Sequence, residues 1–344
     1  MKMFELVEAT NYKRWGAQKA YLHAKREIKG RWPEMEDTIL SKGDVAERYI
    51  SSVIKQRDPD FENVLLRQSD LNAASYYAQK ILKQRWSELE NELKKRVDRD
   101  YDNYYALIAR NYAIDVIKGR WPEMERYFAK DKGLAVTYMM KLIDGEWPAF
   151  KQEILKNRDD WTAILYAEFS KKRFVEAEEF ILQANSGMIV RYATGVLERR
   201  WPEAEPKLLA DKDARDLVTY AREAIRGRWP EAEDIIATDL FIASYYPEVD
   251  GQRFKQIEER IIDSEYLGNY LSNLAPDQRE QFMLDMVQKN PENIQLFPET
   301  SKDVQELALK LGGKRIYLLI KKPHPEIIKM YQGLENVKRT GLFR

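Results

Sequence analysis

The sequence predicts an all-α protein: an α-solenoid of short helix-turn-helix repeats with a smaller C-terminal repeat module. Two observations predict this fold. An Arg-Trp-Pro-Glu motif recurs about every 27 residues over residues 1–265, with neighbouring apolar residues spaced for helices. A different repeat of about 22 residues follows in residues 266–344. We therefore expect two domains, a solenoid of about nine repeats and a C-terminal module with a basic end.

Nine copies of the first motif align on one position, which we call the slot. Clear copies read GRWPEMED from residue 30 and GRWPEAED from residue 227. Six slots hold tryptophan, namely Trp32, Trp86, Trp121, Trp147, Trp201 and Trp229, and the others hold Asp58, Phe174 and Phe254. One spacing is longer because of an insertion around residues 94–104. We expect the slot aromatics to be buried packing wedges between helices rather than an exposed ladder for stacking a ligand.

Each copy predicts two short helices. A tyrosine precedes the slot, and an aliphatic residue follows that tyrosine at helical spacing, as with Tyr112 and Ile117. Gly30, Gly119 and Gly227 are placed to end this first helix. The proline after most slots, and the acidic residues after it, suit the first turn of a second helix. Helices this short are marginal alone and need a stacked neighbour.

Charged residues flank the slot in register. Arginine precedes it in eight of nine copies, and glutamate follows it by four positions in eight of nine. The predicted pairs are Arg31 with Glu36, Arg120 with Glu125, Arg200 with Glu205, and Arg228 with Glu233. The copy around Trp147 reverses both signs, with Glu146 and Lys151. This joint reversal favours a structural ion-pair ladder, since arginine binds carboxylates bidentately; the alternative is an arginine row that binds phosphates.

The C-terminal repeat consists of an apolar segment, a proline-bearing turn and a helix. Its two copies align Ile294 with Ile316, Val304 with Ile327, and Leu307 with Met330. The charge also changes here: residues 302–344 carry a net charge of +6, and the rest of the neutral chain carries −6.

This basic end has three interpretations: a solvated terminus, a contact with an acidic protein surface, or a contact with nucleic acid. The residues expected to contact a partner are Lys314, Arg315, Lys321 and Lys322.

No catalytic, cofactor-binding or metal-binding residues are predicted, so we expect no enzyme. The chain has no cysteine, which excludes thiol catalysis and cysteine-ligated metals, and its two histidines are far apart. The segment from Asp98 resembles the start of a calcium loop, but Asn103 replaces the required glycine and Ala109 the final glutamate. Gly312–Lys314 lacks the remaining residues of a phosphate loop.

The sequence shows no apolar run long enough for a membrane span and no secretory signal. We therefore expect no membrane association.

Both repeats resemble those of a group of viral proteins. YAREAIRGRWPEAED (residues 220–234) is similar to repeats in hypothetical proteins of tailed phages and giant viruses, and NPENIQLFPETSKDVQELALK (residues 290–310) is similar to a second repeat in such proteins. The second likeness is weaker, because Phe297–Pro298 and Lys322–Pro323 replace the usual Asn-Pro. The resemblance implies a viral source and a helical repeat fold, and it supplies no catalytic residues. With a viral source, we expect a location in the host cytoplasm or in a virion.

The leading functional hypothesis is a non-enzymatic interaction protein that binds a protein partner through the solenoid surface. It would serve as a virion component or as a host-directed inhibitor. The alternative is a nucleic-acid-binding repeat protein that uses the arginine row and the basic C-terminus. The near-neutral pI of about 6.8 argues against this alternative.

Overall fold

The computed structural model describes residues 12–99 and 103–331. Every regular element among these residues is helical, which confirms the all-α prediction. The chain divides into two compact units, Met1–Ala177 and Glu178–Arg344, and this division falls inside the sixth repeat. The domain boundary near residue 265 stays a prediction from the change of motif. Residues 100–102 of the insertion and the last basic residues lie outside the described residues.

Each repeat starts with a helix that we call helix A. Six of these helices are followed by one π-turn: α2 (Ala17–His23) with η2 (Ala24–Ile28), α4 (Gly43–Tyr49) with η4 (Ile50–Ile54), α6 (Asn72–Tyr77) with η5 (Ala78–Leu82), α8 (Tyr104–Tyr112) with η6 (Ala113–Ile117), α14 (Ser186–Tyr192) with η8 (Ala193–Leu197), and α16 (Ala214–Tyr220) with η10 (Ala221–Ile225). The others are α10 (Lys132–Leu142), α12 (Asp160–Ser170), α18 (Leu240–Ala243) with the 3₁₀ segment η11 (Tyr246–Val249), and α20 (Leu267–Asn273).

The second helix, helix B, begins directly after the slot, where the proline fits the first helical position. Five helices B are α-helical from that point: α5 (Pro59–Arg67), α7 (Ser87–Val97), α9 (Pro122–Phe128), α11 (Pro148–Asn157) and α17 (Pro230–Ile236). Others start with a 3₁₀ turn: η3 (Pro33–Met35) before α3 (Glu36–Leu40), η7 (Val175–Ala177) before α13 (Glu178–Ile181), η9 (Pro202–Ala204) before α15 (Glu205–Asp211), and η12 (Lys255–Ile257) before α19 (Glu258–Ile261).

The predicted ends of the first helices are one residue too late. The left-handed backbone belongs to the residue before each glycine, namely Lys29, Lys118 and Arg226, with φ of 57°, 53° and 58°. The N–H of this residue closes the π-turn, as in the 2.8 Å bond from Lys118 N to the carbonyl of Ala113. The helix therefore ends at the residue before the glycine.

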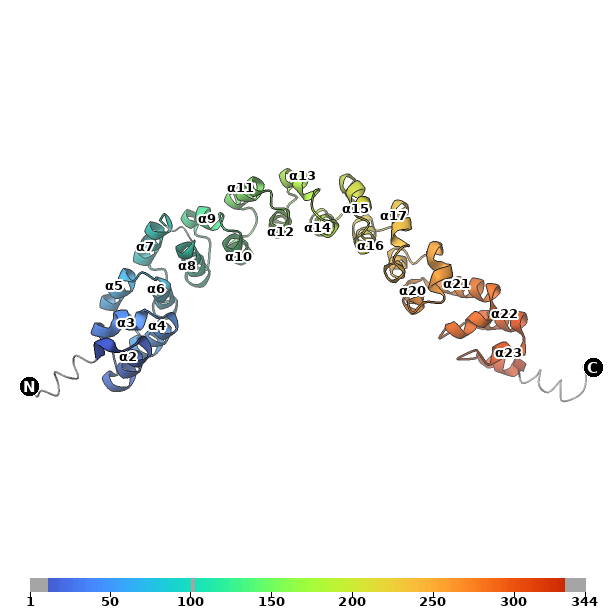
Figure 1. Cartoon of the computed structure of the whole chain (residues 1–344), viewed down its shortest axis with the longest axis horizontal. Helices are drawn as coiled ribbons and strands as arrows, with labels where there is room; N and C mark the ends of the chain where they lie inside the picture. The colour runs from blue at the N-terminus through green and yellow to red at the C-terminus, as the bar shows by residue number, and fades with distance from the viewer. Residues whose placement is uncertain (1–11, 100–102, 332–344) are drawn as a thin grey trace, which may run out of the picture. The chain divides into compact units, whose positions relative to one another are not determined.

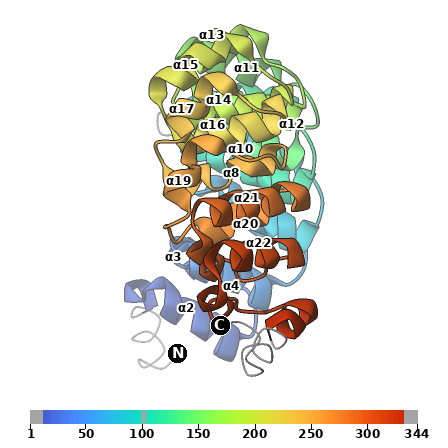
Figure 2. The same cartoon turned by 90° about the vertical axis from the view of Figure 1, so that its right-hand side faces the viewer.

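Neighbouring repeats stack within each unit. In unit 1, α4 packs on α6, α6 on α8, and α5 on α7; in unit 2, α14 packs on α16, and α15 on α17. Helices A and helices B thus form two layers, visible in Figures 1 and 2. Aspartates cap several helices A at their N-termini. The side chains of Asp131, Asp159 and Asp239 accept hydrogen bonds from the first turn of the next helix A.

Unit 2 ends in the second repeat type. Its elements are α21 (Pro276–Lys289), the 3₁₀ segment η13 (Pro291–Leu296), α22 (Lys302–Gly312) and α23 (Lys314–Tyr317), followed by helical residues 325–331. Helices α21 and α22 lie side by side (Figure 2). Ile294, Ile316, Val304 and Ile327 are buried as their alignment predicts, whereas Met330 is about half exposed.

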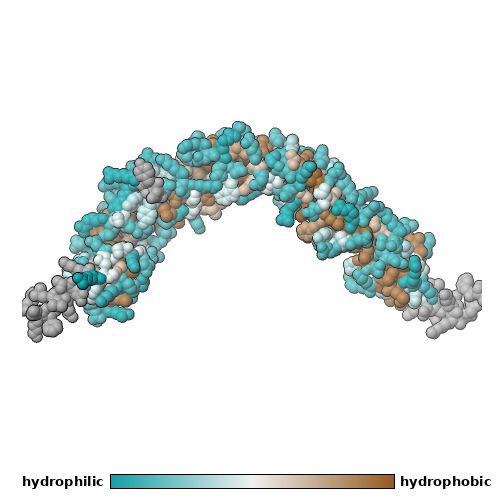
Figure 3. Space-filling view, viewed as in Figure 1, coloured by the Kyte–Doolittle hydropathy of each residue, from teal (hydrophilic) through white to brown (hydrophobic). Residues whose placement is uncertain are grey.

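The slot aromatics form the core between the two layers. Trp121, Trp147 and Trp229 are 1% exposed, and Trp86 and Trp201 are also buried. Trp32, in the first repeat, is half-buried. The face of the described residues that Figure 3 shows is predominantly hydrophilic. Burial of these aromatics matches their interpretation as packing wedges.

Replacing Trp121 or Trp201 with alanine should lower the free energy of unfolding by about 3–5 kcal/mol, because each leaves a large cavity in the core. Chemical denaturation followed by circular dichroism measures the change. Trp161→Ala is the matched control, because Trp161 lies off the slot and is 36% exposed. A loss below about 1 kcal/mol for both core variants would contradict the wedge role.

Candidate functional site

The recurring polar site of this protein is the junction between one repeat and the next. In the fourth repeat, Arg120 donates two 2.7 Å hydrogen bonds to the carboxylate of Glu125. The hydroxyl of Tyr138, from helix A of the next repeat, donates to Glu125 Oε1 at 3.3 Å. The same hydroxyl accepts the backbone N–H of Trp121 at 2.6 Å. We call this set of an arginine, a glutamate, a slot N–H and a tyrosine a repeat junction.

The arginine–glutamate ladder is present in the structure. Two hydrogen bonds join Arg31 to Glu36, Arg57 to Glu62, Arg85 to Glu90, Arg200 to Glu205, and Arg253 to Glu258. Arg228 makes one bond of 3.2 Å to Glu233 and a second ion pair of 2.9 Å to Asp250. The glutamates are the buried partners: the Glu125 side chain is 8% exposed and that of Arg120 42%. The arginine charge therefore offsets the cost of burying each carboxylate.

The tyrosines join the junctions across repeats. Each hydroxyl accepts the slot N–H of the preceding repeat: Tyr49 from Trp32, Tyr77 from Asp58, Tyr112 from Trp86, Tyr138 from Trp121, Tyr166 from Trp147, Tyr220 from Trp201, Tyr246 from Trp229, and Tyr270 from Phe254. Seven tyrosines donate to the junction glutamate of the preceding repeat: Tyr49, Tyr77, Tyr112, Tyr138, Tyr192, Tyr220 and Tyr270. One phenol thereby satisfies two buried groups.

Where the slot of its own repeat is aromatic, the tyrosine ring packs on it. Ring centroids are 5.7 Å apart for Tyr112 and Trp121, and 5.1 Å apart for Tyr220 and Trp229. The tyrosine is thus fixed by its ring in one repeat and by its hydroxyl in the one before. Sequence reasoning assigned these tyrosines only to a helix face. The missed signal is their register, eight or nine residues before the slot.

Two early repeats differ in ways that the junction explains. His23 replaces the tyrosine in the first repeat, and its ring lies 5.0 Å from that of Trp32. Asp58 occupies the second slot, where its carboxylate pairs with Arg31 of the preceding repeat at 2.7 Å and caps α5 through the N–H of Phe61. The Phe61 ring contacts the tyrosine rings on both sides, in place of the missing slot aromatic.

The joint reversal of charge predicts ion pairs within a repeat or between neighbouring repeats, and the reversed copy forms them with the next repeat. Glu146 and Lys151 do not pair with each other; each pairs with a side chain one repeat further on. Lys151 Nζ lies 2.8 Å from Glu176, and Glu146 lies 3.5 Å from Lys172 Nζ. In this copy the cation lies on helix B and the carboxylate lies before the slot, and lysine lacks the planar fork with which arginine binds a carboxylate bidentately. Without a junction glutamate here, the Tyr166 hydroxyl accepts the slot N–H of Trp147 and makes no second hydrogen bond with a described residue.

The four residues predicted to contact a partner lie in the second repeat module. Lys314 lies over the Tyr331 ring, Arg315 pairs with Glu292 at 3.5 Å, and Lys322 pairs with Glu299 at 2.6 Å. Lys321 is exposed and has no ion pair within the described part of the chain. The structure does not gather these cations into one site.

A buried amide joins the C-terminal repeats in the same manner. Gln305 is 1% exposed and accepts the N–H of His324 at 2.9 Å. Its amide nitrogen donates to the carbonyls of Thr300 and Lys322. Gln305 therefore connects α22 to the proline-bearing turn of the next repeat.

Burial keeps the junction tyrosines neutral. Together with the nearby carboxylate of Glu62, burial raises the pKa of Tyr77 to about 12, and burial likewise raises the pKa of Tyr246 to about 12. The pKa of Tyr138 rises further, through burial and the charge of Glu125. A neutral phenol can donate and accept at once, as the junction requires.

Neither a metal site nor a membrane span is formed by the residues that the structure describes. No three acidic or histidine side chains among residues 12–99 and 103–331 are grouped to hold a metal ion. No helix within those ranges is long and apolar enough to cross a bilayer. In comparisons with known proteins, no family model, curated protein or solved structure matches the chain.

Alkaline pH should unfold the protein through the junction tyrosines. An unfolded tyrosine ionises near pH 10, whereas the folded pKa of Tyr77 and Tyr246 is about 12. Their contribution to stability is therefore complete below about pH 10 and is lost as the pH rises through about 12.

Denaturation midpoints across this range, with phenolate absorbance recorded in parallel, measure the effect. We expect the junction tyrosines to ionise only as helicity is lost. Ionisation of all 20 tyrosines near pH 10 with full retention of helicity would contradict this prediction.

Proposed function

We propose that this chain is a non-enzymatic interaction protein that binds a protein partner through its solenoid surface. The observation that supports this proposal is that the polar groups that recur in the repeats form hydrogen bonds within the fold, so they are not free to bind a ligand. Arginine, glutamate and tyrosine of each complete junction bond to one another, as at Arg120, Glu125 and Tyr138. The exposed faces of the stacked helices are left as an extended, repetitive surface, which is the usual binding surface of helical-repeat proteins.

The same observation weakens the nucleic-acid alternative. That alternative needs an arginine row free to contact phosphates. Six of the described arginines instead direct two nitrogens at a glutamate, and the side chain of Arg253 is only 8% exposed. Breaking such a pair to bind a phosphate would leave a carboxylate buried without its partner.

A viral source completes the proposal. It rests on the likeness of the two repeats to those of tailed-phage and giant-virus proteins. In that setting the protein would be a virion component or an inhibitor directed at the host, and its partner would be a viral or a host protein.

The proposal is tested by affinity purification of the tagged full chain from infected host cells, with and without nuclease. We expect one protein partner to be retained after nuclease treatment and to bind the purified chain directly. Oligonucleotides should bind weakly and be released near physiological ionic strength, because few cations are free to displace counterions.

The proposal would be contradicted if two results were obtained together. One is loss of every partner on nuclease treatment. The other is sequence-selective oligonucleotide binding at about 150 mM salt that weakens when Lys314, Arg315, Lys321 and Lys322 are changed to alanine.

A further inference from the structure

Four lysines occupy the same unusual position in the first four repeats. Lys29, Lys55, Lys83 and Lys118 each follow a π-turn and have a left-handed backbone, with φ between 52° and 57°. This conformation costs a side-chain-bearing residue about 1 kcal/mol, and glycine adopts it freely. All four side chains are exposed, and none has a hydrogen bond or ion pair with another described residue. Their charge complements the helix C-terminus, but it is not used in any side-chain contact.

These lysines form one row. The π-turns η2, η4, η5 and η6 contact one another in succession within unit 1. We call residues 24–29, 50–55, 78–83 and 113–118 the lysine edge. It contains seven basic residues and two acidic residues, Glu27 and Asp115, in a chain whose net charge is zero. Because packed helices lie about 8–10 Å apart, successive lysines are spaced by roughly that distance.

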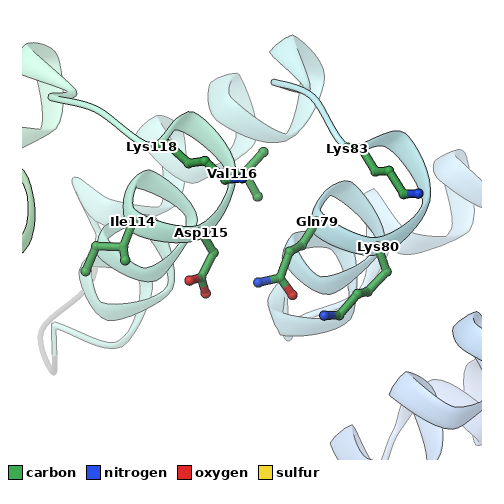
Figure 4. Close-up of a pocket in the computed structure, with 7 residues that line it drawn as sticks. All are labelled: Gln79, Lys80, Lys83, Ile114, Asp115, Val116 and Lys118. Atoms are coloured by element: carbon green, nitrogen blue, oxygen red, sulfur yellow. The ribbon is translucent and has the colours of Figure 1, made fainter.

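The lysine edge also contains a pocket between the third and fourth repeats. Its volume is about 660 Å³, and it is lined by Gln79, Lys80, Lys83, Ile114, Asp115, Val116 and Lys118. Figure 4 shows Gln79 and Asp115 directed into the space between the two π-turns, with Lys83 and Lys118 at the ends of those turns. The pocket thus combines cations, apolar side chains, and groups that can hydrogen-bond a peptide backbone.

We propose that the lysine edge binds an extended acidic polypeptide segment of the partner, with an apolar side chain of that segment in the pocket. This inference rests on the proposed function and names the surface and the chemistry of the partner. An extended segment in the polyproline II conformation advances about 3.1 Å per residue with three residues per turn, so every third side chain lies on the same face, about 9 Å from the last, and meets the next lysine. Acidic residues at that spacing would each face one cation of the row.

Nucleic acid fits this edge less well. Proteins that bind single strands stack the bases on aromatic side chains, and the four segments of the lysine edge contain no aromatic residue. The carboxylate of Asp115 in the pocket would also repel a phosphate, whereas it can accept a backbone N–H of a peptide.

The test uses the full chain with Lys55, Lys83 and Lys118 changed to glycine. Glycine keeps the left-handed backbone, so this variant should be at least as stable as the parent. The control changes Lys171, Lys212 and Arg226 to glycine; these cations have the same left-handed backbone but lie outside the lysine edge. The probe is a fluorescent 15-residue peptide with glutamate at every third position and leucine between, and its counterpart carries glutamine for glutamate.

We expect the parent chain to bind the glutamate peptide about tenfold more tightly than the glutamine peptide at physiological salt. The edge variant should lose that preference, and the control variant should keep it. Equal binding of the two peptides by the parent, or an unchanged preference in the edge variant, would overturn the proposal.

Two further measurements separate this proposal from the proposed function. A protein partner captured by the parent and equally by the edge variant would refute the lysine edge and leave the proposed function standing. A single-stranded oligonucleotide that binds more tightly than the glutamate peptide, and is lost in the edge variant, would refute both and assign the edge to nucleic acid.

Discussion

The stacking of the repeats depends on one buried carboxylate in each complete junction. Glu125, which is almost fully buried, binds Arg120 of its own repeat and Tyr138 of the next. An ionised carboxylate without partners is costly to bury, so its two partners must both be in place. The junction therefore fixes the loop around the slot and the position of the next helix A at the same time. Apolar packing by the slot aromatics supplies stability, and the carboxylate specifies how neighbouring repeats meet.

The reversed copy shows that repeats can stack without a junction carboxylate. Its Glu146 pairs with Lys172 and its Lys151 pairs with Glu176, both in the following repeat. The copy around Trp121 could not pair with its following repeat in this way. That repeat has Gly145 and Ala149 at the positions that Lys172 and Glu176 occupy in the next one. Ring packing of Tyr166 against Phe174 and its bond to the N–H of Trp147 are retained. The contact between repeats is thus kept by a different set of charges.

The second repeat type joins its neighbouring repeats through a neutral side chain. Gln305 is buried and bonds to both sides of the turn that leads into the next repeat. An amide has both donors and an acceptor, so it can satisfy backbone N–H and C=O groups without a counterion. Both repeat types therefore join their neighbours through a buried polar side chain satisfied by the next repeat.

The sequence predicted the features that depend on local pattern. Spacing alone predicts the repeat period, the helix pairs and the burial of Trp121. The joint reversal of charge predicts the pairing of Arg120 with Glu125. What it could not supply was the direction of the contacts between repeats. Tyr138 has the spacing of an ordinary core residue, and nothing in that spacing tells that its hydroxyl reaches the preceding repeat. Likewise, Lys118 rather than Gly119 has the left-handed backbone, at the end of a π-turn that helical periodicity does not reveal.

The central claim is that the junction carboxylate couples adjacent repeats, and a double-mutant cycle between Glu125→Ala and Tyr138→Phe tests it most directly. Because a hydrogen bond to a charged group is worth about 1.5–3 kcal/mol, we predict a coupling free energy of at least about 1 kcal/mol in chemical denaturation. The matched cycle of Lys151→Ala with Tyr166→Phe, where no glutamate joins the repeats, should be nearly additive. Additivity within about 0.3 kcal/mol in the first cycle would contradict the claim.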